Sequence, residues 1–396
     1  MECFATQNLW PLHGRTLVLS LTAKSRTFAI TEPGFSILVF FGSLLAFGIR
    51  GAQYQHKLYG DDKELVAHVL SRKPPYGLFG PLDRLGIFDP FNNYLAVILR
   101  IYTRIALIGP DSGFTFRVFL ISTLTWSLSV LAIAKIIKSQ LSAQSGLIAV
   151  FVCCLLPFSN QTLLAQVNSV VLPFTILAIV VVALQAYPLI PKHRFWFALL
   201  FSMLTLSEGT MIVAIGLMAL NIVKDRKKVI RFELLLLMIS AGSFAIQWLT
   251  YRTRLNHRDP FVHELYRMLF GVAPQFLRSQ AKQHLSLMES TILWIIPVIL
   301  LSSWLVLAVY SQKKKSLLVF PATTLLLSSL GLPVLLIIAN GWLNTHYLFM
   351  PTAIFWISVI FLAHSTRTIH ALPAKISKMF LAFCFIVSIS GTYYVS

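Results

Sequence analysis

Charge, and acidic charge above all, is what this chain has least of. Of its 396 residues only 14 are Asp or Glu, charged residues make up 12%, and the formal net charge is +19. Hydrophobic residues make up 57%, and the mean hydropathy is +0.75. A soluble domain of this length needs more charged surface to stay in water, so the composition indicates a membrane protein.

The chain also lacks the common signatures of catalytic and metal sites. It contains no phosphate-cradling glycine loop, nucleophile elbow, CxxC pair or HExxH sequence. Its four cysteines have no spacing typical of a disulfide framework or a metal site: Cys3, Cys153, Cys154 and Cys384. Residues 1–33 are too polar for the apolar core of a secretory signal, so we expect an uncleaved cytoplasmic tail.

Apolar runs dominate the rest of the sequence, and several approach the roughly 20 residues that a helix needs to cross a bilayer. We predict spans at 34–50, 117–137, 145–158, 167–187, 195–207, 210–224, 231–250, 290–310, 316–339, 347–364 and 378–394. The predicted fold is all-α: a polytopic membrane protein with about 11 transmembrane helices forming a single domain over 34–396.

Basic residues orient these spans. Lys and Arg gather in alternate loops, as at 224–231 and 313–315, whereas the loops 159–166, 208–209 and 340–346 carry none. The positive-inside rule then predicts a multi-pass protein of the cell membrane with a cytoplasmic N-terminus and an outer C-terminus. Attraction to anionic membrane lipid explains much of the net charge. We expect no nucleic-acid partner, which would require positive charge clustered on a soluble face.

Two long loops, 51–116 and 251–289, are predicted to lie outside, and outer loops carry ten of the 14 acids. Residues 61–71 can form a helix that ends before Pro74-Pro75. Residues 93–107 form a second, amphipathic helix with Arg100 and Arg104 on one face. We expect this helix to lie in the outer interface, with its arginines at lipid headgroups.

The acids in these outer segments are the candidate catalytic residues. In "LYGDDKEL", Asp61 and Asp62 follow the first span closely and could act as a general base, or one of them could cap a helix. Glu208 lies in the tight outer turn "LSEGT". A carboxylate at the edge of the hydrocarbon layer costs free energy, so Glu208 is a candidate functional residue. Asp61 with Glu64 and His68 could hold Mg²⁺ or Mn²⁺, although no further ligand has a telling spacing and we predict no firm metal site.

The second outer loop is basic, with Arg252 and Arg254 followed by four further Lys or Arg residues at 258, 267, 278 and 282. Arginine grips phosphate through two parallel hydrogen bonds, so a phosphate-bearing substrate is one interpretation. A surface facing solvent or lipid headgroups is the alternative.

The layout resembles the GT-C class of polytopic glycosyltransferases. The resemblance rests on one span followed by a long outer loop with an early acidic pair, and on "FDPFNNYLAVILRIYTRIALIGP", "LAQVNSVVLPF" and "LLFSMLTLSEGTMIVAIGLMAL". These segments also resemble a loosely defined group of bacterial, largely actinobacterial, membrane proteins. The resemblance to the GT-C class covers roughly residues 34–250. It implies a polyprenyl-phosphate-linked sugar donor, with Asp61 or Asp62 as the general base. The donor phosphate would then lie against arginines such as Arg84, Arg252 or Arg254.

Three alternatives stay open beside the glycosyltransferase. An O-antigen or teichoic-type polymerase or ligase would place its chemistry in the basic loop 251–289. A lipid or solute transporter would need polar groups deep within the spans, where few acids occur. A non-catalytic assembly component, working with partner membrane subunits, is the third.

Overall fold

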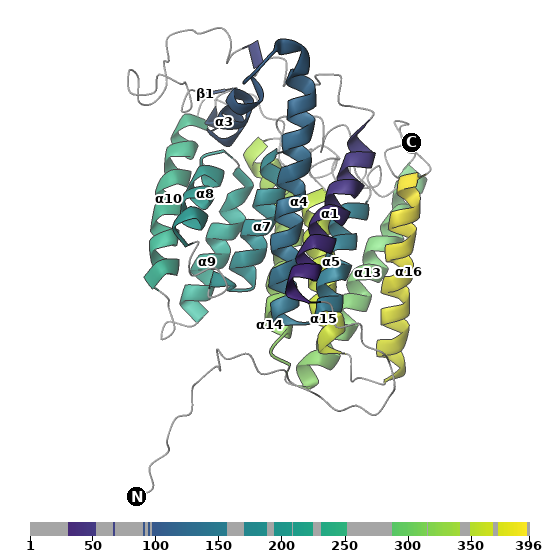
Figure 1. The fold of residues 1–396 in the computed structure, drawn as a ribbon. Coiled ribbons are helices and arrows are strands. Elements are labelled where there is room, and N and C mark those ends of the chain that lie inside the picture. The colour runs from purple at the N-terminus through teal and green to yellow at the C-terminus, as the bar shows by residue number, and fades with distance from the viewer. Residues whose placement is uncertain are drawn as a thin grey trace, which may run out of the picture.

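A computed structural model gives the fold of the chain (Figure 1). It describes residues 31–52, 66–67, 90–91, 94–95, 97–156, 170–187, 194–207, 209–224, 231–251, 287–314, 316–340, 349–366 and 371–393. Within these residues the secondary structure is helical apart from one antiparallel pair of two-residue strands, β1 (Pro90–Phe91) and β2 (Tyr94–Leu95). The all-α prediction is confirmed.

The helices follow the predicted spans closely. They are α1 (Glu32–Gly51), α3 (Val97–Ala106), α4 (Phe114–Gln140), α5 (Ala143–Leu155), α7 (Val171–Ala183), α8 (Arg194–Thr205), α9 (Ile212–Lys224), α10 (Arg231–Tyr251), α13 (Leu287–Lys313), α14 (Val319–Asn340), α15 (Phe349–Ser365) and α16 (Leu372–Tyr393). Each of the eleven predicted spans overlaps one of these helices. By length and composition, α1 and α4 are candidates to cross a membrane, and the other apolar helices are shorter over the residues whose side chains are described.

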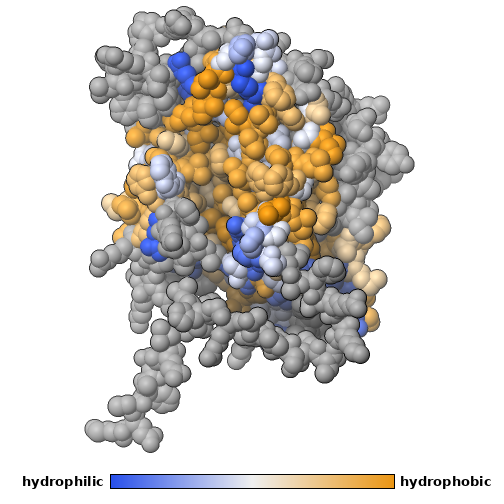
Figure 2. Space-filling model, viewed as in Figure 1, coloured by the Kyte–Doolittle hydropathy of each residue, from blue (hydrophilic) through white to orange (hydrophobic). Residues whose placement is uncertain are grey.

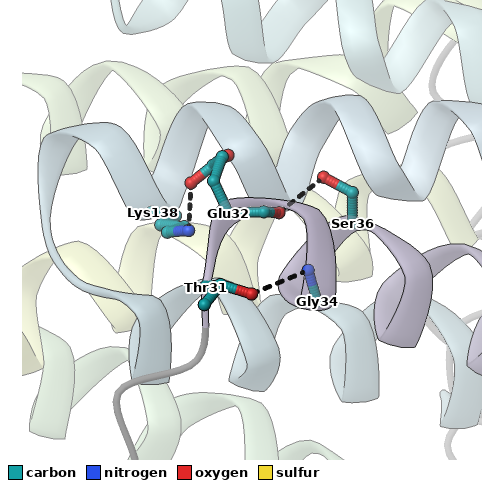
Figure 3. A network of polar contacts seen from close by, with 5 residues as sticks. All are labelled: Thr31, Glu32, Gly34, Ser36 and Lys138. Atoms are coloured by element: carbon teal, nitrogen blue, oxygen red, sulfur yellow. Dashed lines mark hydrogen bonds and ion pairs between the residues drawn. The ribbon is translucent and has the colours of Figure 1, made fainter.

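The start of α1 is fixed by its cap and by one contact to α4 (Figure 3). Thr31 is the N-cap, and its hydroxyl accepts a hydrogen bond from the Gly34 N–H at 3.3 Å. Glu32 forms an ion pair with Lys138, in the last turn of α4. Because the first turn of α1 meets the last turn of α4, the two helices run antiparallel.

Side-chain contacts define the two ends of the bundle. We call one the Lys138 end, where Gln140 of α4 donates to the carbonyl oxygen of Leu184 after α7 at 3.2 Å. We call the other the Arg50 end, where Arg50 of α1 donates to the carbonyl oxygen of Cys154 in α5 at 2.5 Å. In Figure 1 the Arg50 end is uppermost and carries α3 and β1.

One part of the buried core joins α1, α4 and α15. Trp126 of α4 is 1% exposed, and its ring packs on Phe47 at 5.5 Å and edge-on against Phe349 at 5.3 Å between centroids. Aromatic pairs with these offset geometries pack efficiently and bury large areas. The contact therefore joins the first helix of the bundle to one near its C-terminal end.

The outward faces of the peripheral helices are apolar. Along α1, Phe35, Val39 and Phe47 are buried. Five large apolar residues of the same helix are more than half exposed: Ile37, Leu38, Phe41, Leu45 and Ile49. Exposed apolar residues of α1, α10 and α16 include Ile37, Phe41, Leu45, Met238, Ile376, Met379 and Phe383. Figure 2 shows an apolar surface bounded at both ends by hydrophilic patches. Apolar surfaces of this extent mark contact with membrane or with other proteins.

Candidate functional site

The site that the described residues build best lies at the Arg50 end, where α3 packs on the bundle. Tyr102 of α3 donates from its hydroxyl to the carbonyl oxygen of Val118 in α4 at 2.5 Å. The strand before α3, β2, contacts α10, and α3 itself also contacts α8. The amphipathic helix predicted within 93–107 is confirmed over Val97–Ala106, and it belongs to the packed core of the bundle.

Ser207 joins the start of α3 to the end of α8 through hydrogen bonds. Its hydroxyl accepts a hydrogen bond from the N–H of Ile98 at 3.0 Å and donates to the carbonyl oxygen of Met203 at 2.7 Å. The first N–H groups of a helix have no partner within the helix, so a side chain from another element satisfies one of them here. Ser207 is 4% exposed. It directly precedes Glu208 in the chain, so α3 meets the turn that carries this predicted acid.

Arg100 is the most unusual side chain of this region, because it is 2% exposed. The expectation that the arginines of α3 both face lipid headgroups is wrong for Arg100, and Arg104 is itself half-buried. The physical reason is that α3 packs against both α4 and α8, and Arg100 is enclosed in this packing. A guanidinium held away from water interacts strongly with a negative group beside it.

Two other arginines at this end have structural roles. Arg50 donates to the carbonyl oxygens of Cys154 and, at 3.3 Å, Leu156 at the end of α5. Arg117 donates to the carbonyl oxygens of Ala106 and Pro110, at 2.6 and 2.8 Å, after α3. Cations favour helix C-termini, where carbonyl groups lack partners within the helix. These two arginines therefore stabilise helix ends.

The residues predicted to carry chemistry all lie outside the described residues: Asp61, Asp62, Arg84, Glu208, Arg252 and Arg254. Their roles stay predictions. In chain position, residues 53–65 follow the end of α1 and residues 252–286 follow α10. Of the predicted helix 61–71, residues 66–67 are described and are helical.

No metal centre is found among the described residues. There, no three His, Cys, Asp or Glu side chains gather as a metal ion would require. The Asp61, Glu64 and His68 trio lies outside that part of the chain, so its capacity for Mg²⁺ or Mn²⁺ stays a prediction. Cys153 and Cys154 are buried free thiols within α5 and act as small apolar residues.

Sequence reasoning missed a second polar cluster, at the Lys138 end. It consists of Tyr187, Asn221 and Glu233, all buried. The signal was present in the sequence, because Asn221 and Glu233 interrupt the apolar runs 210–224 and 231–250. A buried acid near the end of an apolar run indicates a polar partner or a bound ligand.

Comparisons of the chain with protein-family models, curated proteins and solved structures give no match.

Proposed function

We propose that this chain is a polytopic membrane glycosyltransferase. It moves a sugar from a polyprenyl-phosphate donor to an acceptor on the outer side of the cell membrane. In this arrangement about 11 helices cross the bilayer. The Lys138 end faces the cytoplasm and the Arg50 end faces outward, as the positive-inside rule requires.

Charge and surface support the membrane arrangement. The Lys138 end carries lysines of three separate helices: Lys138 of α4, Lys313 of α13 and Lys378 of α16. Between the two ends the peripheral helices expose large apolar side chains, and Ile37, Phe41 and Leu45 of α1 are 59 to 64% exposed. A lipid environment removes the cost of exposing these side chains to water.

The observation that carries the functional proposal is the burial of Arg100 at the Arg50 end. Helix α3 comes from the predicted outer loop that also contains Asp61 and Asp62, and Ser207 anchors it to the bundle. An arginine in a site of low water content stabilises phosphate more strongly than one at the surface. A buried arginine that follows the acidic pair within the same predicted loop thus supports a phosphate-bearing, lipid-linked substrate.

The chemical step divides the roles among these residues. Asp61 or Asp62 takes the proton of the acceptor hydroxyl as its oxygen attacks the anomeric carbon, and Glu208 is the further candidate acid. The bond from the anomeric carbon to the phosphate oxygen breaks, and the lipid phosphate leaves with the electron pair. Arg100 joins Arg84, Arg252 and Arg254 as a candidate to stabilise the charge that grows on this phosphate. Mg²⁺ or Mn²⁺ could contribute at the same phosphate.

The test uses the full chain in lipid nanodiscs with radiolabelled polyprenyl-phosphate hexoses and pentoses and an extract of envelope acceptors. Release of polyprenyl phosphate is measured. We expect Asp61→Asn or Asp62→Asn to lower kcat by about 10²- to 10⁴-fold. Arg100→Gln should raise KM for the donor or lower kcat, and Arg100→Lys should restore part of the loss. Asp111→Asn, at another acid of the first loop, is the matched control and should leave turnover unchanged.

Other outcomes contradict the proposal in recognisable ways. Turnover that survives both aspartate substitutions but is lost in Arg252→Gln or Arg254→Gln favours a polymerase or ligase acting through the second loop. Movement of labelled lipid across the bilayer without chemical change favours a transporter. A folded chain with neither activity favours an assembly component.

A further inference from the structure

Three buried polar side chains meet at the Lys138 end, far along the bundle from Arg100. Tyr187 follows the end of α7 and is 0% exposed, Asn221 of α9 is 3% exposed, and Glu233 in the first turn of α10 is 5% exposed. They come from three different segments of the helical bundle. None of them has a part in the chemistry proposed above.

These side chains contact one another and the end of α7. Asn221 donates from Nδ2 to the carbonyl oxygen of Val182 at 3.1 Å, and it also hydrogen-bonds the Glu233 side chain. The Glu233 carboxylate lies close enough to Tyr187 to act electrostatically on its phenol. The Tyr187 ring packs edge-on against Phe232 at 5.9 Å between centroids. The cluster is therefore one compact site.

The backbone beside the cluster is held by several other helices. Gln140 of α4 donates to the carbonyl oxygen of Leu184, and Thr324 of α14 donates to that of Ala183 at 3.4 Å. With Asn221 on Val182, three successive carbonyl groups at the end of α7 each accept a bond from a different helix. A site supported in this way keeps its shape when it is empty.

Three oxygen atoms of the cluster are buried and have no hydrogen-bond partner among the described residues: Tyr187 Oη, Asn221 Oδ1 and Glu233 Oε1. Leaving one such atom unsatisfied is costly, and leaving a carboxylate oxygen unsatisfied is costlier. All three can offer a lone pair, so a cation satisfies them together. The C-terminal end of α7 also carries a partial negative charge, which favours a cation nearby.

We propose that Tyr187, Asn221 and Glu233 bind a monovalent metal cation at the Lys138 end. The ligand set is made of oxygen atoms, as hard cations require, and it contains a single carboxylate. One carboxylate balances one positive charge, whereas a divalent ion would leave an uncompensated charge in a buried place. The site is independent of the proposed glycosyltransferase chemistry.

Arg194, at the start of α8, is the competing cation nearby. Its guanidinium lies over the ring of Phe232, with Cζ 5.7 Å from the ring centroid. It forms no ion pair with Glu233, since the one ion pair among the described residues joins Glu32 and Lys138. Arg194 is half-buried, so part of its charge is compensated by solvent and by the aromatic face. Among the described residues, no cation is therefore paired with the Glu233 carboxylate.

The experiment measures the Tm of the purified full chain in detergent by tryptophan fluorescence. NaCl or KCl is titrated against choline chloride at constant ionic strength. A saturable rise in Tm is expected with one alkali cation, of about 2 °C at a tenfold excess over its Kd. Glu233→Gln should abolish the rise in Tm. Tyr187→Phe removes only the hydroxyl and should raise the apparent Kd at least about threefold.

Glu32→Gln is the matched control, because it removes another acid from the same end and should keep the full response. A wild-type Tm that does not change with the alkali cation concentration overturns the proposal. A Tm response equal to that of the wild type in both Glu233→Gln and Tyr187→Phe also overturns it. A response that appears only after Arg194→Gln also overturns it, because Arg194 would then be the cation that occupies the site. If Glu233→Gln fails to fold, the Tyr187→Phe titration and direct binding of ²²Na⁺ or ⁸⁶Rb⁺ to the wild-type chain decide the outcome.

Discussion

Ile98 and Ser207 are 109 residues apart in the chain, yet the N–H of Ile98 donates to the hydroxyl of Ser207 at 3.0 Å. This single bond joins the helix of the first predicted outer loop to the end of α8. Because Ser207 is buried, water does not compete for the bond. The position of Arg100, two residues after Ile98, therefore depends on a side chain from a different part of the bundle.

Ser207→Ala should loosen α3. The Ile98 N–H would lose its partner at the start of a helix, and we expect a loss of about 1 kcal/mol in the free energy of unfolding. Hydrogen exchange followed by mass spectrometry should show faster exchange within Val97–Ala106. Ser202→Ala is the control, because the Ser202 hydroxyl only bonds the Ala198 carbonyl oxygen of its own helix. Equal effects of the two substitutions would contradict a docking role for Ser207.

Gly146→Ala should be destabilising because α5 lies very close to α4 at this residue. A Cβ added at Gly146 would lie 2.8 Å from the backbone oxygen of Ala134 and 3.0 Å from the Phe35 ring. Backbone cannot yield as a flexible side chain can, so we expect a cost of about 1–3 kcal/mol, measured as a fall in the free energy of unfolding.

For Gly42→Ala we expect no loss of stability, in contrast to Gly146→Ala. A Cβ at Gly42 of α1 would meet no atom within 4 Å. Alanine also favours a helix over glycine by up to about 1 kcal/mol, so this variant should be neutral or slightly stabilised. A comparable loss in both variants would contradict the expectation that the close contact of Gly146 with α4 makes that position sensitive.

The helices were predictable from the sequence because long apolar runs are strong signals that tertiary contacts rarely override. Each predicted span overlaps a helix, including the short runs 145–158 and 195–207, which correspond to α5 and α8. The amphipathic stretch 93–107 was also predicted as a helix, but its environment was not. Periodicity places Arg100 on the polar face of α3, and only the packing of α4 and α8 on this helix reveals that the face is enclosed.

The cluster at the Lys138 end was harder to predict for a related reason. Tyr187, Asn221 and Glu233 belong to three different segments, and no spacing rule connects them. Each taken alone is typical of a helix end or a snorkelling polar residue. Their contact depends on how α7, α9 and α10 pack together, and a sequence pattern read one helix at a time does not contain that information.

Trp126→Ala should be among the most destabilising single substitutions in the core. It removes the ring that contacts both Phe47 of α1 and Phe349 of α15. We expect a loss of about 3–5 kcal/mol in the free energy of unfolding. Trp126→Phe keeps an aromatic ring and should cost less, whereas Trp196→Ala, at a side chain that is 65% exposed on α8, should change stability by about 0.5 kcal/mol or less. Unfolding in a graded series of denaturing detergent measures all three.

Labelling of single introduced cysteines tests the proposed orientation in the membrane. Ser112, before α4, and Lys314, after α13, are both exposed and lie at opposite ends of the bundle. Ser112→Cys should react with a membrane-impermeant maleimide in intact cells, because the Arg50 end is proposed to face outward. Lys314→Cys should react only after the membrane is opened.

The experiment uses a chain in which Cys3 and Cys384 are replaced by Ser, and the remaining native thiols, Cys153 and Cys154, are buried. The reverse pattern would invert the proposed topology, and Asp61, Asp62 and Arg100 would then lie on the cytoplasmic side, away from an outer acceptor. Reaction of both cysteines in intact cells would contradict an arrangement in which the helices separate two compartments. The orientation and the site of chemistry are coupled. The positive-inside rule places the Lys138 end in the cytoplasm, whereas the buried Arg100 lies at the opposite end, where the chemistry is proposed.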